Sequence, residues 1–175
     1  NLITSLHRST KRNYLERMVN EKVKCMKIAK RYGAKFWDGD RKFGYGGYRY
    51  IPGRLKPVAK KLIKKFKLNN RSKILDIGCG KGYLLFEIKK ILPNIYIEGF
   101  DKSKYAIQNS HPEVKQNLFI HSAEKRYPFK DKKFDLAISM GCFHNLEIKD
   151  LKFALNEIQR VSNRSYLMVE SYRNE

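Results

Sequence analysis

The chain has 175 residues, of which 42% are apolar, and this length and composition suit one folded domain rather than two domains or a disordered chain. No apolar run approaches the length of about 20 residues that a membrane-spanning helix needs. Three scattered cysteines argue against a disulfide framework and for a reducing compartment, so a cytoplasmic location is expected. The four histidines do not have the spacing of zinc ligands, and no metal site is predicted.

The formal net charge is +21, and it is concentrated in the first part of the chain. Of the 38 basic residues 20 fall within the first 70 positions, together with only 4 of the 17 acidic residues. Such a distribution fits an anionic partner, either nucleic acid or a phosphate-bearing small molecule. The alternative is that these charges lie on solvated helix faces of a lysine-rich protein.

The first 53 residues form the first of two predicted segments. Apolar side chains at helical spacing predict an amphipathic helix over residues 10–32. A loop rich in glycine and aromatic residues follows at 33–53, and we expect it to act as a lid over a cofactor and an acceptor. Alternatively, its aromatic rings anchor the N-terminal segment to the core. The loop residues predicted to contact the acceptor are Trp37, Arg41, Tyr45, Tyr48 and Tyr50, with Tyr45 also a candidate catalytic residue.

Residues 54–175 form the second segment, which we expect to pack with the first as a single compact domain. Strand and helix patterns alternate along it, which predicts an α/β fold with a mostly parallel sheet between two layers of helices. The predicted helices cover 54–68, 83–91, 104–109 and 151–161. The predicted strands cover 73–77, 95–100, 118–122, 134–140 and 165–171.

The sequence DIGCGKG, at 76–82, lies directly between the first predicted strand and its helix. Glycines there allow positive φ angles and let a ligand approach the backbone closely. Asp76, at the end of the strand, suits a cofactor that carries a cationic ammonium group, whereas it would repel a pyrophosphate. Tyr83 also replaces the third glycine of the dinucleotide fingerprint, so a nicotinamide enzyme is disfavoured.

A second acidic residue, Asp101, ends the second predicted strand in the run GFDKS. A carboxylate at this place can accept two hydrogen bonds from a ribose diol. Residues 122–124, Ser-Ala-Glu, follow the third predicted strand, where the edge of an adenine ring is expected.

The segments DIGCGKG, GFDKS, AEKRYPFKDKKFD and LAISMGCFHNL together resemble class I S-adenosylmethionine-dependent methyltransferases of the type 11 small-molecule group, over residues 73–171. The resemblance implies a three-layer Rossmann-like sandwich with strand order 3-2-1-4-5 and S-adenosylmethionine as the cofactor. The cofactor-binding residues that we expect from the motifs and from the resemblance are Asp76, Gly78, Cys79, Gly80, Gly82, Asp101, Lys102, Ala123, Glu124 and Ser139.

The sheet of the resembling family ends with two further strands, the last of them antiparallel, which this sequence lacks. Because an uncovered sheet edge favours association, we expect either a longer native chain or a partner, such as a second copy, at that edge.

Three further residues are candidates near the acceptor. Arg54 lies where it can meet the cofactor carboxylate, and His144 and Asn145 follow the fourth strand on the acceptor side of the resembling family. His144 is also a candidate general base, because an imidazole titrates near neutral pH.

Three functions remain open at this point. The first is methyl transfer to the oxygen or nitrogen of a small polar acceptor such as a sugar, a nucleotide-sugar or an amino-acid derivative. The second is methylation of RNA or another nucleic acid, which the basic charge favours. However, residues 139–144 read SMGCFH and lack the Asn/Asp-Pro-Pro-aromatic run that base N-methylating enzymes usually carry there. The third is a non-catalytic module that only binds the cofactor.

Overall fold

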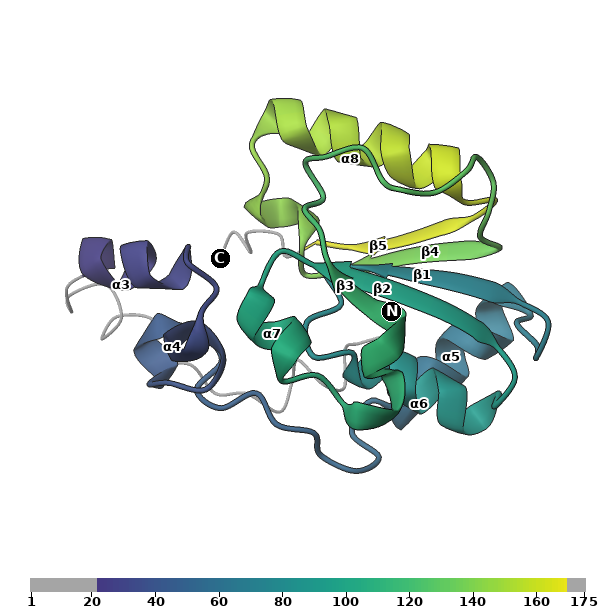
Figure 1. Cartoon of the computed structure of the whole chain (residues 1–175), viewed down its shortest axis with the longest axis horizontal. Coiled ribbons are helices and arrows are strands. Elements are labelled where there is room, and N and C mark those ends of the chain that lie inside the picture. Colours follow the sequence, from purple (N-terminus) through teal and green to yellow (C-terminus); the bar gives the residue numbers. More distant parts are fainter. Residues whose placement is uncertain (1–21, 170–175) are drawn as a thin grey trace, which may run out of the picture.

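A computed structural model describes residues 22–169, and its centre is a five-stranded sheet (Figure 1). The strand order is β3-β2-β1-β4-β5 and every neighbouring pair is parallel, which confirms the predicted topology. Tyr14 and Met18 of the predicted first helix lie outside the described residues. The strands are β1 (Lys73–Ile77), β2 (Tyr96–Asp101), β3 (Leu118–Ile120), β4 (Leu136–Met140) and β5 (Ser165–Met168).

The parallel register brings the carboxyl ends of β1 and β2 together. Ile77 pairs with Phe100, so Asp101 lies one residue beyond the last pair of this ladder. The backbone N–H groups of Gly78 and Cys79 both donate to the Phe100 carbonyl, at 2.8 and 3.1 Å. The chain therefore leaves β1 as a tight loop that stays attached to the end of β2.

Helices cover both faces of the sheet (Figure 1). On one face lie α5 (Lys56–Phe66), α6 (Tyr83–Ile91) and α7 (Lys104–Gln108), and on the other lies α8 (Ile148–Val161). The apolar stripe predicted for α5 is buried at Val58, Leu62 and Phe66, and that of α8 is buried at Ala154 and Ile158. Each face of the sheet thus has its own hydrophobic core.

In the described part of the N-terminal segment, short helical elements also form within the predicted loop. This part contains α3 (Lys22–Ala29), α4 (Ala34–Trp37) and a 3-10 turn at Arg41–Phe43 within the expected loop. Two further 3-10 turns lie at Pro112–Asn117 and Phe143–Asn145. Such short turns carry too few residues for a periodic apolar pattern, so periodicity could not predict them. Across residues 22–169 no helix is both long and apolar enough to cross a membrane.

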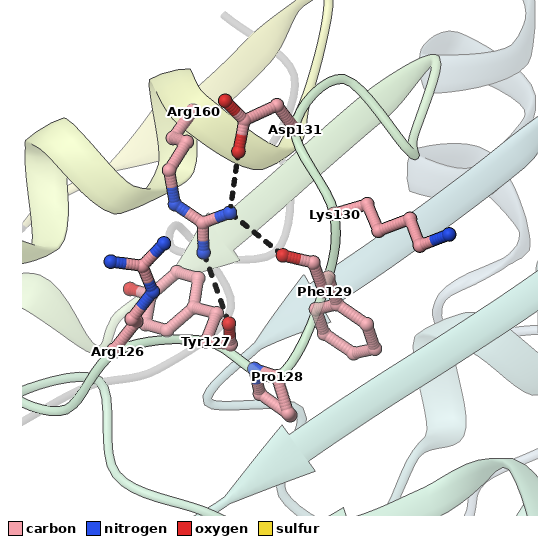
Figure 2. A pocket seen from close by; sticks show the side chains of 7 residues that line it. All are labelled: Arg126, Tyr127, Pro128, Phe129, Lys130, Asp131 and Arg160. Atoms are coloured by element: carbon pink, nitrogen blue, oxygen red, sulfur yellow. Dashed lines mark hydrogen bonds and ion pairs between the residues drawn. The ribbon is translucent and has the colours of Figure 1, made fainter.

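Arg160 of α8 holds the segment between β3 and β4 against its helix (Figure 2). All five of its N–H groups donate hydrogen bonds. Nε donates to Glu157, and Nη2 donates to Glu157 and to the Tyr127 carbonyl. Nη1 donates to Asp131 and to the Phe129 carbonyl. Glu157 also accepts from the backbone N–H of Tyr127 at 2.7 Å. All five donors of the guanidinium are used within the protein. Arg160 therefore has no N–H group left to bind an anionic ligand in the adjacent pocket (Figure 2).

We predict that Arg160→Met lowers the free energy of unfolding by about 3 kcal/mol, because it leaves the largely buried Glu157 carboxylate without its partner. Urea unfolding at neutral pH measures this change. Lys149→Met, at an exposed position of the same helix, is the matched control and should change stability by less than about 0.5 kcal/mol. Equal stability of the two variants would show that the Arg160 contacts contribute little.

Candidate cofactor-binding site

The loop at 78–82 is built on left-handed glycines at the carboxyl end of β1. The φ angles of Gly78, Gly80 and Gly82 are +75°, +56° and +73°. A Cβ on Gly78 would lie 2.6 Å from the Cβ of Cys142, and one on Gly82 would lie 2.6 Å from a methyl carbon of Leu118. Any other residue at these two positions would combine an unfavourable φ with a steric clash.

Asp76 is a buried carboxylate without a partner. Its side chain is only 4% exposed, and within residues 22–169 it has no hydrogen bond and no ion pair. Burial and the neighbouring charge of Asp101 raise its pKa to about 7. A buried carboxylate that lacks a donor is costly, so this site is suited to a cationic or hydrogen-bond-donating ligand.

Asp101 holds the glycine loop in place. One carboxylate oxygen accepts from the Gly80 N–H at 2.9 Å, and the other accepts from the Ser103 N–H at 2.8 Å. Burial raises the pKa of Asp101, although these two N–H donors and Lys102 oppose the shift. Each oxygen keeps a second lone pair, so the carboxylate can still accept bonds from a diol.

The other predicted cofactor residues lie around these two carboxylates, with different exposure. The Nζ of Lys102 is 3.6 Å from a carboxylate oxygen of Glu124, and both side chains are exposed. Ala123 is buried. The Ser139 hydroxyl is also buried and donates to the Ile77 carbonyl at 2.9 Å, so its hydrogen is committed to joining β4 to β1.

Cys79 is part of the glycine loop, and Cys142 packs against it. Cys79 packs into the core beneath α6, and burial raises its pKa well above the usual value. Cys142 lies against Gly78 and is more accessible. Burial, with Asp101 next in effect, raises the pKa of Cys142 to about 12. Both groups are therefore neutral thiols at physiological pH rather than thiolate nucleophiles.

Aromatic side chains of the N-terminal segment pack directly on the glycine loop. Trp37, which is 5% exposed, stacks on Tyr45 with ring centroids 5.1 Å apart. A Cβ on Gly80 would meet the Trp37 ring at 2.9 Å. The indole N–H of Trp37 donates to the Ser103 hydroxyl at 2.8 Å, so this ring fixes the segment to the end of β2.

An ion pair between a buried lysine and a partly exposed aspartate joins the same segment to the loop. Lys81, within the glycine motif, is 4% exposed and donates to both carboxylate oxygens of Asp38, at 2.9 and 2.8 Å. It also donates to the Tyr48 carbonyl at 2.8 Å, and the Tyr105 hydroxyl donates to Asp38. Burial opposes ionisation of Asp38, but the hydrogen bonds from Lys81 and Tyr105 outweigh it and lower its pKa. The sequence analysis did not predict this ion pair, although a lysine between two loop glycines indicated that a charged side chain lies in the loop.

The Tyr48 phenol lies close enough to Asp76 for the carboxylate charge to affect its pKa. The Tyr48 ring packs between Tyr45 and Tyr83, with ring centroids 4.7 and 5.2 Å away. Burial raises the pKa of the phenol, Asp76 raises it further, and Arg54 opposes the shift. The Tyr48 phenol is therefore neutral, and the Arg54 side chain is exposed.

The remaining predicted residues lie away from this region or at the surface. Tyr50 packs on α6, and its hydroxyl donates to Glu87 at 2.5 Å. Arg41 is exposed and donates to the Tyr45 carbonyl. His144 and Asn145 are exposed neighbours, with the Asn145 amide 3.2 Å from the imidazole. Among residues 22–169 no three His, Cys, Asp or Glu side chains gather in a way that could hold a metal ion.

Comparison with known proteins agrees with this geometry. A family model described as a methyltransferase domain matches residues 68–175. A ribosomal RNA small subunit methyltransferase C of Buchnera aphidicola is 33% identical over 107 residues, which cover 59% of this chain and 30% of that protein. A demethylmenaquinone methyltransferase of Thermotoga maritima is 28% identical over 111 residues, which cover 63% of this chain and 47% of that protein. The chain thus spans less than half the length of these relatives.

Solved structures share the fold. A SAM-dependent methyltransferase from Aquifex aeolicus superposes with a TM-score of 0.51 at 19% identity, over 73% of this chain and 78% of that one. The [4+2]-cyclase SpnF also superposes, with a TM-score of 0.53 at 22% identity, over 61% of this chain and 40% of that one. The fold therefore does not fix the reaction by itself. The family match covers most of the chain, however, and the chain belongs to the methyltransferase domain family, with the class I Rossmann-like fold.

Proposed function

We propose that this chain binds S-adenosylmethionine across the carboxyl ends of β1, β2 and β4 and transfers its methyl group to a small polar acceptor. The observation that carries the proposal is the unpartnered, buried Asp76 carboxylate beside Asp101. A ligand ammonium supplies the cation that residues 22–169 do not offer to Asp76. The residues present fit the cofactor, because Asp76 suits its ammonium group and Asp101 suits its ribose diol.

Each half of the cofactor has its own candidate residues. Asp76 pairs with the ammonium of the methionine half, and Arg54 pairs with its carboxylate. Asp101 accepts hydrogen bonds from the ribose diol through the lone pairs that Gly80 and Ser103 leave free. The adenine lies beside the loop after β3, near Ala123 and Glu124.

The bound cofactor supplies an electrophilic methyl group on a sulfonium, and the protein's main task is to hold an acceptor in line with it. Such positioning contributes up to about 7–11 kcal/mol to lowering a barrier. Tyr45 and Tyr48 line the acceptor side in this proposal, where their rings face a cation favourably. His144, which is exposed beside Asn145, removes a proton when the acceptor is a hydroxyl.

A second candidate acceptor is RNA, and one surface of the structure favours it. The exposed side of α5 consists of lysines, and within the described residues none of them makes an ion pair. Three pairs are four residues apart, and each costs the helix about 0.2–0.5 kcal/mol through repulsion. By contrast, α8 on the opposite face mixes acidic and basic residues. The α5 lysines are Lys56, Lys60, Lys61, Lys64 and Lys65.

The relatives' names leave both acceptors open. The Buchnera protein acts on ribosomal RNA by its name, whereas the Thermotoga protein acts on demethylmenaquinone. A module that binds the cofactor without turnover is the remaining alternative.

Asp101→Asn should weaken binding of S-adenosylhomocysteine at least tenfold, because the amide offers the ribose diol and the Gly80 N–H one acceptor oxygen in place of two. Isothermal titration calorimetry measures the affinity, and thermal melting checks that the variant is folded. Lys149→Met is the control and should bind as the parent does. A well-folded parent chain that fails to bind S-adenosylhomocysteine would disprove the cofactor assignment, and binding without methyl transfer would leave a cofactor-binding module.

Affinity for S-adenosylhomocysteine should rise between pH 6 and pH 8 and level off above pH 8, because the Asp76 pKa of about 7 makes the ligand ammonium compete with a proton. Asp76→Asn should bind weakly at every pH. The pH titration by calorimetry should therefore be flat for this variant.

Asp76→Asn should also stabilise the ligand-free protein at pH 8, by about 1–3 kcal/mol. The folded pKa of Asp76 lies above its unfolded value near 3.9, so ionisation costs stability. This cost is absent below pH 4 and complete above pH 7. Urea unfolding at pH 5 and pH 8 measures it, and a variant that is less stable than the parent at pH 8 would contradict the assignment.

If RNA docks on α5, the double variant Lys60→Gln/Lys64→Gln should bind single-stranded RNA more weakly and with a salt slope shallower by about 1.4. Gel shifts at several salt concentrations measure the slope. The control Lys149→Gln/Lys152→Gln removes the same charge from α8. Equal losses in the two double variants would mean that RNA responds to net charge rather than to this face.

A further inference from the structure

Tyr32, which the sequence analysis did not single out, is held at the end of β2. It lies between α3 and α4 in the left-handed region, with a φ of +47°. Its carbonyl accepts from the Ser103 hydroxyl at 2.5 Å and from the Trp37 indole N–H at 3.0 Å. Ser103 in turn donates its N–H to Asp101, so the Tyr32 backbone is fixed next to the proposed ribose-binding carboxylate.

The Tyr32 ring extends from there toward the loop that follows β3. The Nζ of Lys102 lies 4.7 Å from the centroid of this ring and 3.6 Å from a carboxylate oxygen of Glu124. One ammonium thus joins the ring to Glu124, across the gap between the ends of β2 and β3. Burial raises the pKa of the Tyr32 phenol, and the charges of Asp101 and Glu124 add to this shift, which agrees with that placement.

We propose that Tyr32 is part of the nucleoside half of the cofactor site and packs its ring against the bound adenosine. The proposal rests on the proposed function, because it uses the ribose and adenine positions assigned there. The ring is half-buried and contacts Phe36 in an edge-to-face arrangement, with ring centroids 4.9 Å apart. Aromatic rings stack favourably on nucleobases, and such a contact requires no base-specific hydrogen bond.

The location of Tyr32 predicts which half of a ligand responds to its loss. A residue at the nucleoside end contributes equally to S-adenosylhomocysteine and to 5′-methylthioadenosine, which has the same nucleoside but no amino acid. A residue at the methionine end, such as Arg54, contributes only to the first ligand. A purely structural residue would instead lower the affinity for every ligand together with the stability of the fold.

The test is calorimetry with both ligands on four proteins: the parent, Tyr32→Asn, Tyr32→Phe and Arg54→Gln. Asparagine tolerates the left-handed backbone and removes the ring. We expect Tyr32→Asn to bind both ligands about tenfold more weakly, which is about 1.4 kcal/mol. Tyr32→Phe should regain most of the affinity. Arg54→Gln should lose affinity for S-adenosylhomocysteine and keep that for 5′-methylthioadenosine.

If Tyr32→Asn does not fold, Tyr32→Leu keeps an apolar side chain against Phe36, lacks the flat aromatic face, and should show the same loss for both ligands. Unchanged affinity for 5′-methylthioadenosine would overturn the proposal. Tighter binding of both ligands would also overturn it, because the ring would then obstruct the site. A parent chain that binds neither ligand would refute the proposed function itself, before any variant is compared.

Discussion

Two buried carboxylates at neighbouring strand ends are the constraint on which the candidate site depends. Asp76 and Asp101 repel one another, yet the register of β1 and β2 keeps them close. Asp101 is stabilised by the backbone N–H groups of Gly80 and Ser103, whereas no basic side chain within residues 22–169 pairs with Asp76. The fold thus carries an electrostatic cost that a cationic ligand relieves, as expected where binding rather than stability has shaped a site.

The N-terminal segment is tied to this site by contacts that end on the glycine loop or on β2. Lys81 binds Asp38, and Trp37 reaches Ser103. Trp37 anchors the segment, and its ring also packs over Gly80. That the segment covers a ligand stays a prediction. A change in the segment therefore alters the shape of the loop that it contacts.

The fold does not identify the acceptor, whereas the distribution of surface charge provides information about it. A cyclase shares this fold, so the sheet and its helices do not specify the reaction. The exposed side of α5 consists of lysines, whereas α8 carries both acidic and basic residues. The basic charge is therefore concentrated on one surface, and this surface is the feature that concerns an RNA partner. The small-acceptor and RNA proposals therefore make separate predictions, the first at Asp76 and Asp101 and the second at the exposed lysines of α5.

The sequence by itself determined the alternation of strands and helices, the glycine loop and the strand ends that carry Asp76 and Asp101, because alternating apolar patterns and a glycine motif are local signals. The strand order followed from the family resemblance and not from these patterns. Only the tertiary structure decided which side chains meet across long separations. The pairing of Lys81 with Asp38, the left-handed Tyr32 beside Lys102 and the five-donor contact of Arg160 join segments that no local pattern relates. The absence of a partner for Asp76 within residues 22–169 is likewise a property of three-dimensional packing, since this part of the chain is rich in lysine and arginine and none of them pairs with it.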